Sequence, residues 1–182
     1  MPVVSILIGL VLSSFVKAAQ QIPQPPLGIP GSLLELPNPP TPEKVELGRF
    51  LFFDKRLSLD NTVSCASCHR PENAFSEATP VSTGIRGQKG GRKSPSFVNQ
   101  AWTIYPNFFW DGRADSLEAQ AIGPIANPIE MGNTHENAVK TIAGIPGYLP
   151  LFKNAFGDEG VSLDKIAKAL SDYERTRMSG NS

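Results

Sequence analysis

The apolar positions of this 182-residue chain recur at helical spacing, and no stretch alternates apolar and polar residues as a half-buried strand does. The pattern predicts a series of helices. They begin at Pro42 and then cover residues 116–120, 134–143, 148–156 and 162–178. Thr41, Thr134 and Ser162 stand at the expected N-caps, and Gly123-Pro124 is expected to end the second helix. The predicted fold class is therefore mainly α.

Two long segments between these helices show no periodicity. Residues 70–96 are polar and rich in glycine, and residues 97–110 are rich in aromatic side chains. A loop as long as the first is usually functional in a compact domain. We therefore predict an ordered loop that wraps a bound group, followed by an irregular aromatic segment.

The N-terminal part of the chain differs in composition from the rest. An apolar run over residues 3–16 ends at Lys17, and it is too short to span a membrane comfortably. It suits a signal peptide of residues 1–18, although no Lys or Arg precedes the run and an uncleaved anchor stays open. Residues 19–40 are rich in proline, which favours an extended lead-in. The domain proper is expected to cover residues 41–182.

Charge and composition narrow the function classes. Lysine and arginine together number 17, as do aspartate and glutamate, so the formal net charge is zero. No basic excess indicates nucleic-acid binding. The chain has two cysteines and two histidines, and both cysteines fall within one short motif.

That motif, Cys65-Ala66-Ser67-Cys68-His69, is the attachment signature of a c-type haem. The two thiols can form thioether bonds to one haem, and His69 then becomes the proximal iron ligand. A zinc site would need four ligands. A redox-active pair would need a βαβ context, which is missing, and a Cys65–Cys68 disulfide would close too small a loop to stabilise much. Covalent haem attachment and the apolar leader together predict a periplasmic protein.

Several further motifs lie in a fixed order along the chain. They are Glu46-Leu47-Gly48-Arg49-Phe50-Leu51-Phe52-Phe53-Asp54-Lys55-Arg56-Leu57-Ser58, Gly90-Gly91-Arg92-Lys93-Ser94-Pro95-Ser96, Phe109-Trp110-Asp111-Gly112-Arg113-Ala114, Leu117-Glu118-Ala119-Gln120-Ala121, Gly123-Pro124-Ile125 and Ile129-Glu130-Met131. With the haem motif, the segment from Thr41 to Met178 resembles the N-terminal haem domain of the bacterial di-haem cytochrome c peroxidases and their MauG-type relatives. The resemblance implies a cytochrome c-like domain whose long loops wrap the haem. The family carries a second haem domain, so this chain is expected either to be truncated before that domain, which is favoured, or to be a single-haem version.

The resemblance also implies roles for residues outside the haem motif. Glu130 matches the distal acid–base residue, Gln120 a distal amide, and Pro124 a proline that lines the pocket. Trp110 matches the tryptophan that lies between the two haems of the family. From spacing alone, Glu130 would be a surface carboxylate, Gln120 an exposed helical side chain and Trp110 a core residue.

Other polar residues receive structural interpretations. We expect Asp111 and Arg113 to form a salt bridge, and His135 to be solvated rather than a ligand.

Two positions depart from the family pattern. Ile85 stands where many of these peroxidases have a histidine that ligates the first haem in the resting state, so an open, high-spin haem is expected. Lys93 stands where the family usually has a calcium-binding asparagine. Because calcium takes oxygen ligands, calcium binding by this chain is doubtful.

The resulting hypothesis is reduction of hydrogen peroxide to water, with electrons from a small periplasmic c-type cytochrome or cupredoxin, or MauG-type oxidation of a partner protein. The alternative from another class is an electron carrier without catalysis, in which Met131 is the sixth iron ligand. A homodimer is a further possibility, and no membrane contact is expected beyond the signal segment.

Overall fold

The computed structural model describes residues 36–102 and 105–180, together with residues 22, 24, 25 and 28. This part of the chain is helical and contains no strand, only isolated bridges such as that between Arg70 and Ser76. The prediction of a mainly α fold is confirmed. The predicted signal peptide and most of the proline-rich extension lie outside the described residues.

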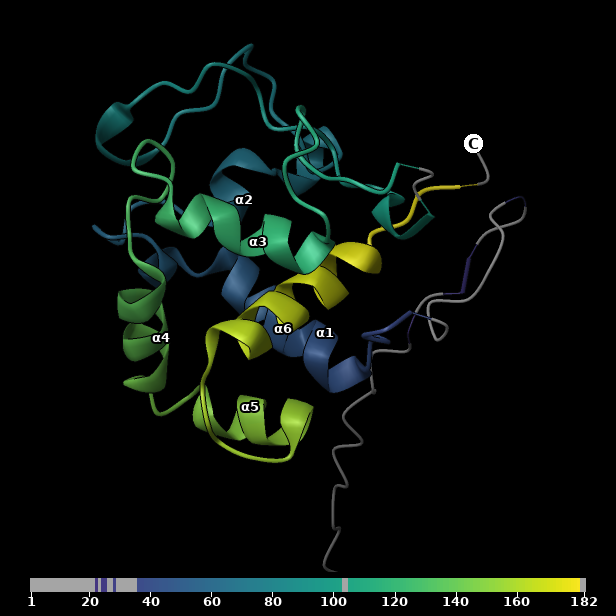
Figure 1. Cartoon of the computed structure of the whole chain (residues 1–182), viewed down its shortest axis with the longest axis vertical. Helices are drawn as coiled ribbons and strands as arrows, with labels where there is room; N and C mark the ends of the chain where they lie inside the picture. Colours follow the sequence, from purple (N-terminus) through teal and green to yellow (C-terminus); the bar gives the residue numbers. More distant parts are fainter. Residues whose placement is uncertain (1–21, 23, 26–27, 29–35, 103–104, 181–182) are drawn as a thin grey trace, which may run out of the picture.

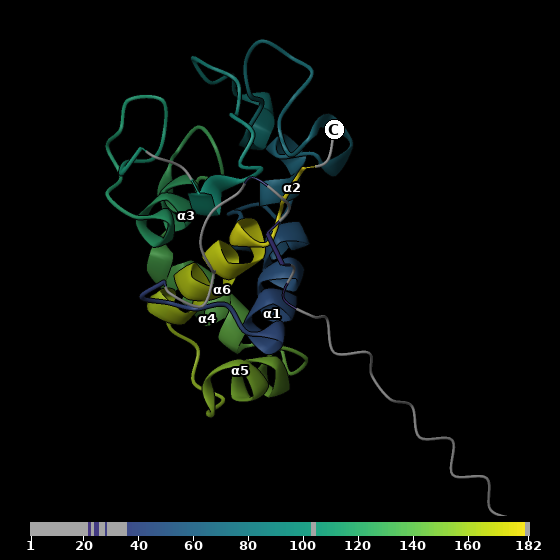
Figure 2. The ribbon, with the colours of Figure 1, turned by 90° about the vertical axis from the view of Figure 1, so that its right-hand side faces the viewer.

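Helices α1 (Pro42–Phe53) and α6 (Leu163–Arg175) pack against each other at the centre of the domain (Figures 1 and 2). Gly48 permits this packing, because a Cβ at that position would overlap the carbonyl oxygen of Ala169. Backbones approach this closely only where one residue has no side chain. α1 and α6 thus form a fixed helical platform at the centre of the domain.

The predicted N-caps are confirmed. The hydroxyl of Thr41 accepts a hydrogen bond from the Lys44 N–H at 3.3 Å, and Pro42 occupies the first turn of α1. Thr134 caps α4 (His135–Ala143) and Ser162 caps α6 in the same way. These contacts satisfy N–H groups that a helix start otherwise leaves without a partner.

The predicted end of the second helix is wrong. Helix α3 (Leu117–Ala126) continues through Gly123 and Pro124. A proline inside a helix costs about 3 kcal/mol. Here only the last turn is affected, and continuation of the helix buries Ile125 completely. Burial of such an aliphatic side chain contributes about 1.5–3 kcal/mol and offsets much of that cost.

The remaining helices close the lower end of the domain in Figure 1. α5 (Leu149–Phe156) packs on α1, and α4 packs on α3. His135 is half-buried, and its Nε2 lies 2.9 Å from the carbonyl oxygen of Ile122. The expectation of a solvated His135 is therefore wrong, because this contact ties α4 to α3.

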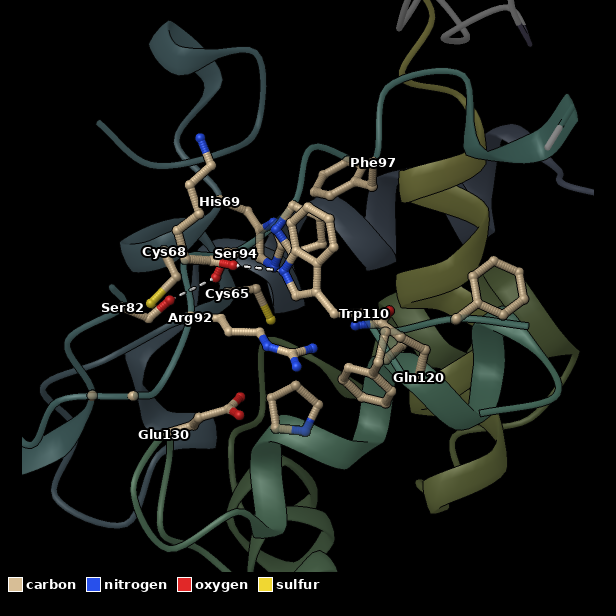
Figure 3. Close-up of a pocket in the computed structure, with 18 of the residues that line it drawn as sticks. Cys65, Cys68, His69, Ser82, Arg92, Ser94, Phe97, Trp110, Gln120 and Glu130 are labelled. Atoms are coloured by element: carbon tan, nitrogen blue, oxygen red, sulfur yellow. Dashed lines mark hydrogen bonds between the residues drawn. The ribbon is translucent and has the colours of Figure 1, made fainter. Parts of the chain in front are cut away.

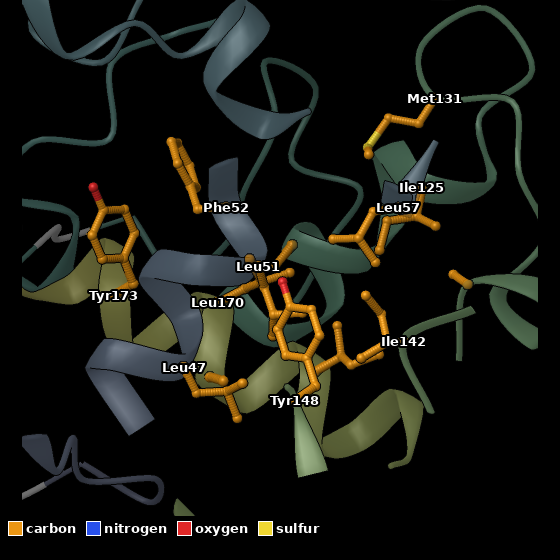
Figure 4. Close-up of a cluster of buried hydrophobic side chains, with 14 of the residues drawn as sticks. Leu47, Leu51, Phe52, Leu57, Ile125, Met131, Ile142, Tyr148, Leu170 and Tyr173 are labelled. Carbon is orange, nitrogen blue, oxygen red and sulfur yellow. The ribbon is translucent and has the colours of Figure 1, made fainter. Parts of the chain in front are cut away.

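The core has an aliphatic part and an aromatic part. Leu51, Leu57, Ile125 and Leu170 are fully buried in the first (Figure 4). The second surrounds Phe52, whose ring contacts those of Phe53, Phe75, Phe97 and Tyr173 at centroid distances of 5.0–6.3 Å. This aromatic cluster reaches the haem motif, since the rings of Phe97 and His69 lie 5.3 Å apart.

The long segment after the haem motif is ordered, as predicted, and lies above α2 and α3 in Figure 1. Its helical elements are the 3-10 turns η3 (Pro71–Asn73) and η4 (Ile85–Gly87), and η5 (Gln100–Trp102) lies in the aromatic segment that follows. Within the described ranges, no helix is long and apolar enough to cross a membrane.

Candidate haem site

One helical turn presents the whole haem motif. α2 (Cys65–Cys68) begins after Ser64, whose N–H donates to the Ser67 hydroxyl at 2.9 Å. The N–H of His69 donates to the carbonyl oxygen of Cys65 at 2.9 Å, which continues the turn. Both thiols and the imidazole therefore border the same space (Figure 3).

That space is a cavity of about 380 Å³, and its lining is mostly apolar. Every residue predicted for the site lines it, including the candidate ligand of the electron-carrier alternative. These residues are Cys65, Cys68, His69, Trp110, Gln120, Pro124, Glu130 and Met131. Residues from α2, from α3 and from the turn after α3 thus meet at one site.

The imidazole of His69 is fixed by the backbone. Its Nδ1 lies 3.0 Å from the carbonyl oxygen of Phe75, so Nδ1 carries the proton and donates. The neutral imidazole then offers Nε2 to a metal, an arrangement usual for ligand histidines. Burial lowers the pKa of His69, against the opposing effect of the Phe75 hydrogen bond, and so favours this neutral form.

The turn that supplies this carbonyl group is strained. Ala74 and Phe75 have φ angles of 53° and 56°, in the left-handed region. Such a conformation is unusual for a bulky residue and costs on the order of 1–3 kcal/mol. It folds the chain back so that the Phe75 N–H donates to the Arg70 carbonyl oxygen at 2.8 Å, while the Phe75 carbonyl group faces His69. Sequence analysis did not identify Phe75, because its role lies in its main chain.

The two thiols lack the properties of a redox pair. Burial raises the pKa of Cys65 and of Cys68 to about 12, with smaller contributions from Glu174 to the first and Glu77 to the second. Reactive Cys-x-x-Cys pairs instead have a lowered thiol pKa. This argues against the thioredoxin-like alternative and suits cysteines that become thioethers.

Glu130 enters the cavity from the turn that follows α3 (Figure 3). Its carboxyl group is half-buried and accepts a hydrogen bond from Asn127 Nδ2 at 2.7 Å. Burial raises the pKa of Glu130, although the charge of Arg113 and the Asn127 hydrogen bond act in the opposite direction. Asn127 was missed in the sequence, where only its place three residues before Glu130 hints at this contact.

The segment that carries Ile85 packs against the main chain of Glu130. The Ile85 N–H donates to the Glu130 carbonyl oxygen at 2.8 Å, and the side chain of Ile85 is buried beneath Gly132 rather than lining the cavity. Gly84 lies so close that a Cβ there would overlap the carbonyl oxygens of Ile129 and Glu130. Position 84 therefore controls where the main chain of Glu130 can lie.

Gly84→Ala should displace Glu130 while leaving the haem motif intact. Because misplacing a reacting group by about 1 Å can cost ~10²-fold in rate, we expect a loss of that order in the reaction with hydrogen peroxide. Stopped-flow spectroscopy of the haem protein measures it. Gly87→Ala is the matched control, since nothing lies within 4 Å of a Cβ there. Gly87 has a φ of 71°, so a modest loss of stability is expected from the control, but no loss of rate.

Trp110 is not a core residue, in contrast to the interpretation from spacing alone. Its side chain is 58% exposed, and its Nε1 donates to the carbonyl oxygen of Lys93 at 2.9 Å. The predicted salt bridge between Asp111 and Arg113 is confirmed at 2.8 Å. Trp110 thus stands at the rim of the cavity with an exposed ring.

Met131 is almost completely buried and belongs to the hydrophobic core, next to Leu57 and Ile125 (Figure 4). Its main chain is fixed too, because its N–H donates to the Pro124 carbonyl oxygen at 3.2 Å and its own carbonyl oxygen accepts from Leu59 at 2.9 Å. A methionine held in this way is a poor candidate for a sixth iron ligand, since its thioether already has a packing role.

The donor set fits a covalently bound haem. Two side-by-side thiols, a neutral imidazole with a fixed tautomer and a largely apolar cavity are what attachment of haem c needs. One buried acid, Glu174, also borders this cavity, and its Oε2 has no hydrogen-bond partner among the described residues. An orphaned buried polar group of this kind is expected where a missing group completes the site. The helical fold and this site together define a c-type cytochrome domain.

Comparison with known proteins gives the family. The sequence model of the family described as di-haem cytochrome c peroxidase matches residues 42–182, and the chain belongs to this family. Methylamine utilization protein MauG of Methylorubrum extorquens is 46% identical over 144 residues, which are 79% of this chain and 40% of that protein. Cytochrome c551 peroxidase of Nitrosomonas europaea is 40% identical, over 79% of this chain and 42% of that protein.

A solved structure supports this family membership. The crystal structure of a MauG-like protein associated with microbial copper homeostasis superimposes with a TM-score of 0.75 at 36% identity, over 85% of this chain and 46% of that chain. The expected cytochrome c-like domain is thereby confirmed, and family membership together with the motif makes haem c the cofactor. The chain spans about 40–42% of the length of the two curated relatives named above.

Proposed function

We propose that this chain forms the peroxide-reacting haem domain of a periplasmic peroxidase. The supporting observation is that Glu130, with a raised pKa, borders the same cavity as the histidine whose tautomer leaves Nε2 free. The overall reaction is H₂O₂ + 2 e⁻ + 2 H⁺ → 2 H₂O. The haem, when bound, supplies the iron that exchanges electrons with the peroxide.

The residues of the chain move and position protons. Glu130 is proposed to accept the proton of one peroxide oxygen and deliver it to the other, so that the bond between the oxygens breaks as water leaves. Asn127 holds one carboxylate oxygen of Glu130 at 2.7 Å and so sets its orientation. Gln120, from the same cavity wall as Pro124, is proposed to orient the peroxide by hydrogen bonding.

The electrons are proposed to come from a small c-type cytochrome or a cupredoxin. Trp110 suits a contact with a redox partner or with a second haem domain, because its ring is exposed at the cavity rim. The MauG-type variant, oxidation of a partner protein, uses the same site, and the 46% identity to a MauG protein supports it equally. A second haem, a homodimer and the absence of calcium stay predictions.

The optical spectrum of the purified ferric protein tests this proposal. Because Ile85 is buried and cannot bind iron, we expect a high-spin ferric haem that changes rapidly on addition of stoichiometric hydrogen peroxide. A bis-histidine low-spin spectrum would contradict the open site. A low-spin spectrum with a methionine-to-iron band, unchanged by peroxide, would contradict the proposal and favour the electron-carrier alternative, for which Met131 is the candidate ligand.

A further inference from the structure

Glu174 is a buried acid that the proposed peroxide chemistry does not use. It lies on α6 between Tyr173, which faces the aromatic cluster, and Arg175, which faces α3. Only 6% of the residue is exposed, and its Oε2 is buried without a hydrogen-bond partner in the described residues. A buried carboxyl group without a partner is costly unless it is neutral or is compensated by a charge nearby.

The position of Glu174 indicates what this compensating charge is. The residue lines the haem cavity, and its charge acts directly on Cys65. Since Cys65 is a proposed attachment site, a haem held there would share the cavity with this carboxyl group. Oxidised haem iron carries one more positive charge than reduced iron. An ionised Glu174 therefore stabilises the oxidised state, and a neutral Glu174 suits the reduced state.

We propose that Glu174 is the proton-binding partner of this haem: it takes up one proton from solvent when the haem accepts one electron from a donor, and releases it when that electron leaves. The step balances, since one electron and one proton enter together and the cavity keeps its net charge. Glu174 acts through the haem and is a positioning residue rather than a catalytic one. The proposal rests on covalent haem attachment and not on the peroxide chemistry, so a protein inert to peroxide would still test it.

The charged groups around Glu174 are compatible with its proton-binding role. Burial raises its pKa to about 8; Arg175 opposes the rise and Glu118, from α3, adds to it. Glu118 and Arg175 largely neutralise each other through contacts of 2.7 and 2.9 Å. From α1, Lys44 is engaged with Asp172 and Arg49 with Glu46. The charged residues elsewhere on the cavity wall are Arg92, Lys93, Asp111, Arg113 and Glu130.

Potentiometric titration of the haem-loaded chain between pH 5 and 10 tests the proposal. We expect the reduction potential to fall with pH over a window that includes pH 8, with a slope approaching 59 mV per pH unit for one proton per electron. Glu174→Gln mimics the protonated acid. Its potential should match that of the unmodified protein at the acidic end, exceed it at the alkaline end, and lose the slope between them.

Glu118→Gln is the matched control, because it removes the same charge from a group outside the cavity lining. It should keep the slope but shift the window to lower pH, since the charge of Glu118 raises the pKa of Glu174 and its loss frees Arg175. Thermal unfolding should show that Glu174→Gln is folded.

A slope that persists in Glu174→Gln would overturn the proposal and assign the proton to a haem propionate or to Glu130. Infrared difference spectra of the unmodified protein give a second measurement that depends on no variant. At pH 8, reduction should produce the C=O band of a protonated carboxyl group, and the Glu174→Gln protein should lack it. A spectrum of the unmodified protein without such a band would equally refute the assignment.

Discussion

Replacing Glu130 by glutamine is expected to slow the reaction of the ferric protein with hydrogen peroxide by about 10²–10⁴-fold. Glutamine preserves the shape of the side chain and its contact with Asn127, but it cannot accept a proton. The loss would therefore measure proton transfer rather than packing. Stopped-flow spectroscopy at increasing peroxide concentrations gives the second-order rate constant for both proteins.

The pH dependence of the reaction rate tests whether Glu130 acts as an ionised base. Glu130 must be ionised to accept the first proton, so the rate should fall as the pH falls through its pKa. Burial raises this pKa above the ordinary carboxyl value, and the fall should begin at a correspondingly higher pH than for an exposed glutamate. In Glu130→Gln this dependence should disappear together with the rate.

Glu136→Gln is the matched control for this experiment. Glu136 lies exposed in the first turn of α4 and outside the cavity lining, so its replacement should leave rate and pH profile unchanged. If Glu130→Gln reacted with peroxide as fast as this control, the carboxylate would have no part in proton transfer. The proposed role would then have to pass to another group of the cavity.

The sequence predicts those parts of the structure whose geometry is set by contacts between residues that are close in sequence. Cys65, Cys68 and His69 are brought together by a single helical turn, so their spacing alone defines their geometry. The helix starts at Thr41, Thr134 and Ser162 depend on one side-chain contact within three residues, and they were correctly predicted for the same reason.

The features that the sequence does not reveal depend on tertiary contacts. Pro124 lies inside α3 because burial of Ile125 offsets the local preference to stop. Phe75 acts through a carbonyl group, which no side-chain pattern reports. Glu174 shares a helix with the exposed Asp164 and the buried Asp172, and only the packing of α6 against its neighbours shows that Glu174 is buried at the cavity. For Ile125 and Glu174 the deciding contacts join segments that are distant in sequence, whereas Phe75 lies only six residues from His69 but acts through its main chain.

The sequence predicts the roles of Glu130 and Ile85 only in part. The order of motifs predicts that position 130 belongs to the site, and the structure brings it to the cavity. The sequence shows only that Ile85 cannot bind iron. Its contacts with Gly132 and with the main chain of Glu130 add that the position supports the distal residue.

Phe52→Ala is expected to have the largest effect on stability, because Phe52 connects the helical platform to the haem motif. Its ring is fully buried against Phe75, Phe97 and Tyr173. Removing a buried phenylalanine side chain typically lowers the free energy of unfolding by about 3–5 kcal/mol. Whole domains are stable by only about 5–15 kcal/mol, so much of the margin would be lost. Denaturant unfolding followed by circular dichroism measures this change.

Phe53→Ala is the control, since the neighbouring ring belongs to the same helix but is 44% exposed. Its replacement should cost less than about 1.5 kcal/mol, because little packed area is lost. The effect of Phe52→Ala should also reach the haem: Phe97 would lose its support, and the ring of Phe97 lies 5.3 Å from that of His69. Equal losses in the two variants, with unchanged haem spectra, would show that the aromatic cluster does not support the proximal histidine.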